Sequence, residues 1–131
     1  LSEQINMYIY KDDEEIKLFA ENVFIDIDKE FISSKNLKVN HNDIIFIGRE
    51  VSLSDDLISI YGTPISFAKN DNFEGYSNEI KIDLKKSLLY LSGTSNILVN
   101  GKNISGEDII FDYKKNSILN SENLRIKSGN S

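Results

Sequence analysis

The sequence predicts an all-β fold in which short antiparallel strands stack around a continuous apolar interior. Three observations support this class: a motif recurs about every fourteen residues, apolar and polar residues alternate on both sides of it, and turn-forming residues separate its copies. A chain of 131 residues is long enough for one domain with a core of its own. We therefore expect a single jelly-roll-like or solenoid-like domain over residues 1–131.

The repeated motif has the form small, any, any, apolar, any, apolar. Its copies begin, in chain order, at Ala20, Ser34, Gly48, Gly62, Ser77, Gly93, Gly106 and Ser121, and the copy at Gly93 contains one extra residue. The first apolar residues of the copies are 23, 37, 51, 65, 80, 97, 109 and 124, which are 14, 14, 14, 15, 17, 12 and 15 residues apart. Such regular spacing indicates one structural unit used repeatedly.

Each unit is predicted to contain a corner. Ile58 and Ile60 precede Gly62 in an alternating pattern, and Ile65 and Phe67 follow it in another. The separation of Ile60 and Ile65 is an odd number of residues, so an unbroken strand would place the two apolar pairs on opposite faces. A bend or bulge at the small residue returns both pairs to one face, and the proline at position 64 then lies where pairing is already interrupted.

Polar segments join the units and have the composition of turns. They are, in chain order, DIDKE, NHND, SDD, KNDN, DLKKS, NGK and DYKKNS. Each unit is thus predicted to run strand, corner, strand, turn, and eight units give about 16 short strands.

The face that carries the apolar pairs is predicted to form the interior, because the residues between them, such as Lys38, Ser52 and Ser66, are mostly polar. Periodicity alone leaves two interpretations open. The interior is either an ordinary hydrophobic core or a trough whose walls stay apart and hold an acyl chain.

Several kinds of chemistry are not expected. The net charge is −6 with scattered basic residues, which argues against nucleic acid as a partner, and there is no cysteine. His41 is the only histidine and lies in a turn segment, where we expect a structural or solvated role. Asp26 and Asp28 have no surroundings that would separate their pKa values, and the segment 69–75 lacks the closing Glu of a Ca²⁺ loop. We expect no catalytic residue, no metal site, no cofactor and no enzymatic activity.

The two ends of the stack are predicted to be interaction edges. End strands expose unpaired N–H and C=O groups, and the segments INMYIY and NLRIKSGNS carry little charge or proline to block them. Head-to-tail self-association through these edges is the expected consequence.

The segment from Tyr61 to Leu119 resembles the OstA-like family, and within it the LptA-type lipopolysaccharide transport proteins. A Gly-x-Pro-x-x-Phe run is followed by a polar loop, Glu-Gly, an alternating strand, Leu-x-Gly and then Gly-Glu-Asp before a tyrosine. The residues that carry the resemblance are Gly62, Pro64, Phe67, Glu74, Gly75, Leu91, Gly93, Gly106, Glu107, Asp108 and Tyr113. The N-terminal half follows the repeat but departs from the family at Gly48 to Val51 and at the motif SKNLKV.

The resemblance implies a twisted β-jelly-roll, or β-taco, of about 16 antiparallel strands. It also implies a periplasmic bridge that binds lipopolysaccharide and meets LptC-like and LptD-like proteins through its edge strands. Lipid A acyl chains would lie in the apolar trough. The lipid-binding residues would be Ile44, Phe46, Val51, Leu53, Ile58, Ile60, Ile65, Phe67, Ile80, Ile82, Leu89, Leu91, Ile97, Val99, Ile109 and Phe111.

Two alternatives stay open at this point. Within the family, the periplasmic domain of LptC and the N-terminal domain of LptD share the implied fold. A different class, a β-solenoid adhesin or carbohydrate-binding module, is compatible with the repeat and with the content of Asn and Tyr.

Overall fold

The computed structural model describes residues 4–11, 14–26, 28–29, 31–54 and 57–128, of which 4, 11, 35 and 120–128 are described by their backbone alone. These residues form ten strands of one antiparallel sheet, ordered β1-β2-β4-β5-β6-β7-β8-β9-β10, with β3 paired to β4 beside that path. The strands are β1 Gln4–Lys11, β2 Glu14–Glu21, β3 Phe24–Asp26, β4 Phe31–His41, β5 Ile44–Ser54, β6 Leu57–Lys69, β7 Phe73–Asp83, β8 Leu88–Val99, β9 Lys102–Asp112 and β10 Ser117–Ser128. The all-β expectation is confirmed.

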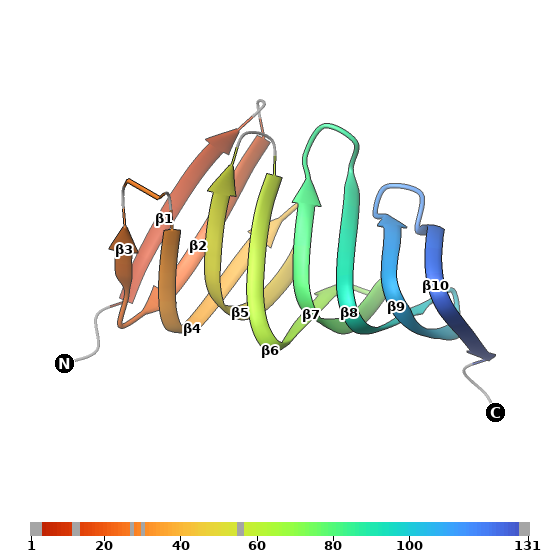
Figure 1. Ribbon diagram of the computed structural model, residues 1–131. Coiled ribbons are helices and arrows are strands. Elements are labelled where there is room, and N and C mark those ends of the chain that lie inside the picture. Colours follow the sequence, from red (N-terminus) through yellow and green to blue (C-terminus); the bar gives the residue numbers. More distant parts are fainter. Residues whose placement is uncertain (1–3, 12–13, 27, 30, 55–56, 129–131) are drawn as a thin grey trace.

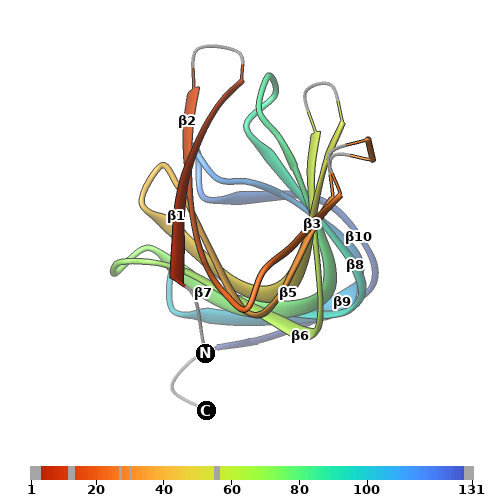
Figure 2. The same ribbon diagram turned by 90° about the vertical axis from the view of Figure 1, so that its left-hand side faces the viewer.

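The sheet is bent along its length into two walls that face each other (Figures 1 and 2). The first wall contains β1, β2 and the parts of β4–β9 next to the turns at 42–43, 70–72 and 100–101. The second wall contains β3 and the parts next to the turns at 84–87 and 113–116. Cα atoms of different described strands approach within 8 Å only between strands that pair in the sheet, so away from the bends the facing walls contact each other through side chains. We call the gap between the turns of the two walls the mouth.

The bends coincide with interruptions in strand pairing, as the repeat predicts. Register shifts lie between Ser33 and Leu37, Ile47 and Glu50, Tyr61 and Ile65, Tyr76 and Glu79, Leu91 and Thr94, and Asn120 and Glu122. Each of these intervals contains one of the small residues that begin the motif copies, and the interval after Tyr61 also contains Pro64. The remaining two small residues, Ala20 and Gly106, stay paired, and a residue of positive φ follows each of them two positions later, Asn22 and Asp108.

Serine hydroxyls at the bends form hydrogen bonds with backbone groups of neighbouring strands. The Ser77 hydroxyl donates to the carbonyl of Ser92 at 3.0 Å and lies 2.8 Å from the Ser95 hydroxyl. The Ser34 hydroxyl accepts from the N–H of Glu21 at 3.1 Å and also donates to the Glu21 carbonyl. Because buried backbone groups need partners, these hydroxyls explain why serine occupies the small position of the motif at Ser34 and Ser77.

The strand count differs from the prediction of about 16. The chain passes through most corners without leaving the sheet, so that β5, for example, continues from Ile44 to Ser54 across the bend at Gly48. A bulge displaces one or two residues from the ladder while pairing resumes on both sides. Two predicted short strands therefore become one long, bent strand in every unit after the first.

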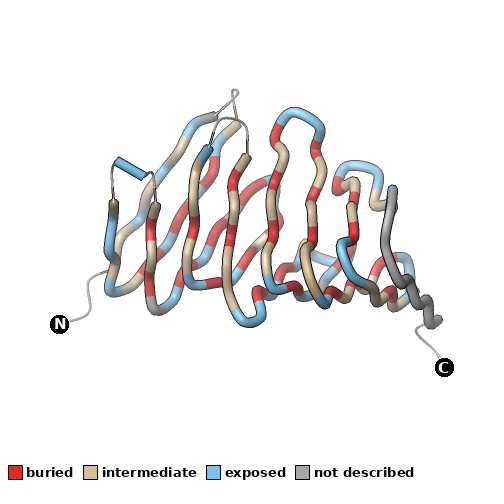
Figure 3. Tube along the Cα trace, viewed as in Figure 1, coloured by how far each residue is buried: buried red, intermediate tan, exposed pale blue. Residues whose placement is uncertain are grey.

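The buried apolar residues of both walls form one core between them, and buried positions alternate with more exposed ones along the strands (Figure 3). In β6, Ile58 and Ile60 on one side of the bend and Ile65 and Phe67 on the other are all buried. The bend therefore places both apolar pairs on one face of the sheet, as their odd separation in the sequence requires. Within the part of the chain that the structure describes, no helix has the length and apolar character to span a membrane.

Candidate functional site

The predicted lipid-binding residues lie together in the interior between the walls. Fifteen of the sixteen belong to the buried core, and the exception, Leu53, is partly buried and packs against it. The first wall contributes residues such as Phe46, Phe67 and Val99, and the second contributes residues such as Ile58 and Leu91. The structure therefore brings the whole predicted set into one apolar space.

The interior is filled by its own side chains, because thirteen of the sixteen residues have a relative exposure below 2%. Aromatic rings form a continuous row inside it. The ring centroid of Phe67 lies 6.3 Å from that of Phe46 and 6.2 Å from that of Phe73, and Phe73 meets Phe111 at 4.8 Å in an edge-to-face contact. Phe73 and Phe111 belong to different walls, so this last contact joins the walls directly.

Some buried residues of the interior are not among the predicted lipid-binding residues. Phe73, Leu84, Ile104 and Tyr113 are buried in the same core. Phe73, Leu84 and Tyr113 border or lie in turns, outside the six-residue motif, and Ile104 lies just before a small residue whose upstream pattern is incomplete. The alternation upstream of the motif, extended through the turns, would have identified them.

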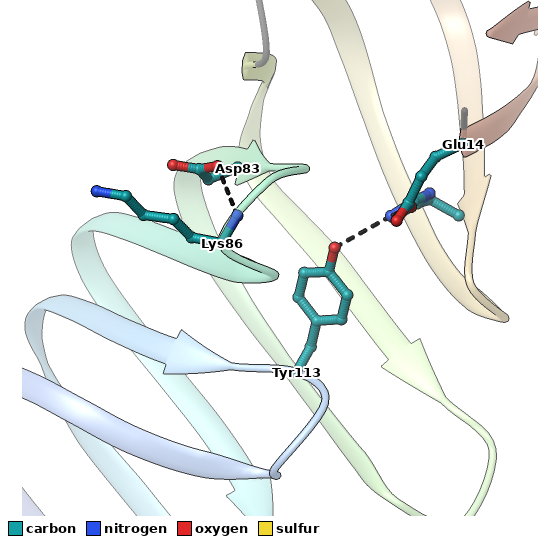
Figure 4. A network of polar contacts seen from close by, with 5 residues as sticks. Glu14, Asp83, Lys86 and Tyr113 are labelled. Atoms are coloured by element: carbon teal, nitrogen blue, oxygen red, sulfur yellow. Dashed lines mark hydrogen bonds and ion pairs between the residues drawn. The ribbon is translucent and has the colours of Figure 1, made fainter. Parts of the chain in front are cut away.

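A polar cluster lies at the mouth, above the apolar interior. His41 ends β4 on the first wall, and its Nε2 lies 3.1 Å from the Tyr113 hydroxyl of the second wall. The same nitrogen is 3.0 Å from a carboxylate oxygen of Glu14, the first residue of β2 (Figure 4). The rings of His41 and Tyr113 also meet edge to face, with centroids 5.8 Å apart. His41, for which we expected a structural or solvated role, is therefore buried and in contact with both walls.

Burial shifts the pKa values of His41 and Tyr113 in the directions that favour the neutral forms of both side chains. Desolvation lowers the pKa of His41, Lys114 lowers it further, and Glu14 together with the backbone of Glu15 opposes the shift. Desolvation raises the pKa of Tyr113 to about 12, and the Ser87 hydroxyl opposes that change. Both groups are therefore neutral in the folded protein at neutral pH.

We expect the free energy of unfolding to fall on both sides of neutral pH. The unfolded chain binds a proton at histidine near pH 6.5 while folded His41 resists it, so stability is lost as the pH falls below about 6.5. Tyr113 stays protonated to about 12, so stability is also lost as the pH rises from about 10 towards 12. Urea unfolding from pH 5.5 to 7.5 measures the acid limb.

The control for the acid limb is His41→Gln, because the chain has no other histidine. The free energy of unfolding of this variant should be nearly independent of pH between about 5.5 and 7.5, because this range lies above the ordinary pKa values of Asp and Glu. An unchanged slope in the variant would contradict the assignment of the acid limb to His41.

A shallow groove lies on the outer face of the first wall. It has a volume of about 590 Å³ and is lined by residues that include Ile47, Ser66, Tyr76 and Asn96. Ile47 and Tyr76 are exposed large side chains, with 53% and 44% of their surface accessible. These residues occupy polar-face positions of the pattern, so the sequence did not indicate a groove there.

Asp26 and the segment 69–75 make hydrogen bonds that close turns at the ends of strands. An Asp26 side-chain oxygen accepts a hydrogen bond from the Lys29 N–H at 3.2 Å, and the turn after β6 is closed by the Asn72 N–H and the Lys69 carbonyl at 3.0 Å. In the described part of the chain, no three His, Cys, Asp or Glu residues are grouped so that they could hold a metal ion. The arrangement thus consists of an apolar interior with a polar mouth.

These features define the class of open, bent antiparallel sheets whose two walls enclose an apolar interior. Neither the protein-family models nor the curated proteins contain a match to the chain. A solved structure of this class does match it: LptH, the LptA-homologous periplasmic component of the lipopolysaccharide transport device from Pseudomonas aeruginosa. The TM-score is 0.72, the sequence identity is 13%, and the match covers 91% of this chain and 98% of LptH. The likeness confirms an LptA-like fold.

Proposed function

We propose that this chain is a non-enzymatic, periplasmic component of lipopolysaccharide transport, and that residues 1–131 act as a single β-jelly-roll domain. The observation that carries the proposal is an apolar interior enclosed by two walls that are continuous at the bends and that face each other with no pairing between their described strands. The LptA-like fold supports this role, because LptH is described as a component of the lipopolysaccharide transport device.

In this proposal, lipid A acyl chains occupy the interior and contact the sixteen predicted residues, from Ile44 to Phe111. In the structure these residues contact one another. An acyl chain can replace such contacts at small cost, because apolar side chains and methylene groups offer each other similar dispersion contacts. The walls must separate to make room, and no backbone pairing between described strands of opposite walls opposes that movement.

The two edge strands supply the proposed contacts with partners. β1 pairs only with β2 and β10 pairs only with β9 among the described strands, so each has one unpaired side. We propose that LptC-like and LptD-like proteins, or further copies of this chain in head-to-tail order, add strands there.

Site-specific photo-crosslinking tests the proposal. A photo-reactive residue replacing Phe67 or Leu91, which are 2% and 1% exposed, should capture lipopolysaccharide in envelope extracts. The matched controls are Ser66 and Tyr76, which lie on neighbouring positions of the first wall and are exposed to solvent. Equal capture of lipopolysaccharide at inward and outward positions, or no capture at any of them, would contradict the proposal.

A further inference from the structure

The contact between His41 and Tyr113 spans the mouth. His41 lies at the end of a first-wall strand, and Tyr113 lies in the turn that follows β9 on the second wall. Figure 2, which looks along the sheet, shows this turn reaching across the space between the walls towards β2. Because the sheet twists, residues 72 positions apart in the chain meet directly at 3.1 Å.

The contact is buried and its side chains have several partners. His41 and Tyr113 are each 1% exposed, and Glu14 approaches the same imidazole nitrogen from β2. Figure 4 shows the Tyr113 ring pointing from its turn towards Glu14. The Tyr113 backbone is fixed as well, since its N–H donates to the Ser87 carbonyl at 3.2 Å. Another ring contact between the walls, Phe73 with Phe111, is apolar.

We propose that Glu14, His41 and Tyr113 form a latch that must open before a lipid passes along the interior. The inference rests on the proposed function. A lipid with its acyl chains between the walls and its polar headgroup in water must have its connecting atoms in the mouth. Wherever it moves along the interior, those atoms move along the mouth, and side chains joined across the mouth stand in their path.

The latch is made of a few weak interactions. It consists of one hydrogen bond to a tyrosine hydroxyl, an edge-to-face ring contact and a nearby carboxylate. A typical hydrogen bond changes an equilibrium constant by a factor of about 2 to 13. A contact of this size adds to the packing of the interior in favour of the closed mouth, and contacts with a bound lipid can outweigh it.

The first test removes the hydroxyl and keeps the ring. In Tyr113→Phe, a photo-reactive residue at position 91 should capture purified lipopolysaccharide about 2- to 10-fold faster than in the unsubstituted background. The matched control is Tyr90→Phe, because Tyr90 is a partly buried tyrosine of β8 outside the latch. Capture that is no faster in Tyr113→Phe than in Tyr90→Phe, with both variants folded by circular dichroism, would overturn the latch.

The second test closes the mouth covalently and does not depend on weakening the fold. The chain has no cysteine, so Glu15→Cys and Lys114→Cys provide one exposed thiol on each wall beside His41. A short, cleavable bis-maleimide across them should abolish capture at position 91, and cleavage of the linker should restore it. Capture that persists with the linker intact would refute the latch and leave the proposed function standing. Absence of capture from the uncrosslinked and cleaved proteins as well would refute the proposed function itself.

Discussion

Replacing Phe111 with alanine is expected to lower the free energy of unfolding by about 3–5 kcal/mol. The side chain is fully buried on the second wall and meets Phe73 of the first wall with ring centroids 4.8 Å apart and planes at 71°. Its removal leaves a cavity at a point where no described strands of the two walls pair with each other. Equilibrium unfolding in urea measures the loss.

A double-mutant cycle with Phe73→Ala isolates the contact between the walls, for which we expect a coupling of about 0.5–1.5 kcal/mol. The control is Leu119→Ala, since Leu119 is 57% exposed and its truncation should change stability by less than about 0.5 kcal/mol. A Phe111 variant as stable as the Leu119 variant would show that the interior does not hold the walls together.

Replacing Gly75 with alanine is expected to lower the free energy of unfolding by about 2–3 kcal/mol. A Cβ atom at this position of β7 would lie 2.1 Å from the Asn96 carbonyl oxygen and 2.8 Å from the Phe67 ring. The backbone of the neighbouring strand cannot move aside without disturbing its pairing with β7, where Gly75 is opposite Ile97. Urea unfolding again provides the measurement.

Gly101→Ala separates this steric effect from the general cost of losing a glycine. Gly101 has φ of 74°, and a Cβ atom added to it would have no other atom within 4 Å, so its replacement should cost only about 1–2 kcal/mol through backbone strain. If Gly75→Ala destabilised the protein less than Gly101→Ala, close packing between β7 and β8 would not be the reason for the glycine.

Much of the fold follows from the odd number of residues that separates the apolar pairs on the two sides of small residues such as Gly62. The odd separation between Ile60 and Ile65 requires a bulge if both are to be buried, and the register shift between Tyr61 and Ile65 provides it. The count of about 16 strands is not confirmed for the same reason, because pairing resumes beyond each bulge and the described residues form ten strands. Small residues and a proline mark a disturbance of the ladder, but whether pairing resumes afterwards depends on the neighbouring strands.

The interior was predicted better than the mouth. Apolar residues at regular spacing identify an inward face by local rules, which is why fifteen of the sixteen proposed lipid contacts are buried. The meeting of His41 with Tyr113 depends instead on the accumulated twist of the strands that separate them in the sheet. No short segment contains that information, and nothing in the turn NHND distinguishes a buried histidine from a solvated one.

The continuity of the strands through their bends has a mechanical consequence. Since the ladders run around the base of the fold and no described strand pairs across the interior, the base can act as a row of parallel hinges. Opening such a structure strains a few bulged residues per strand and leaves the hydrogen bonds of each wall intact. If the walls separate as the proposed function requires, the interior widens while the secondary structure remains constant, and lipids of different width then fit the same fold.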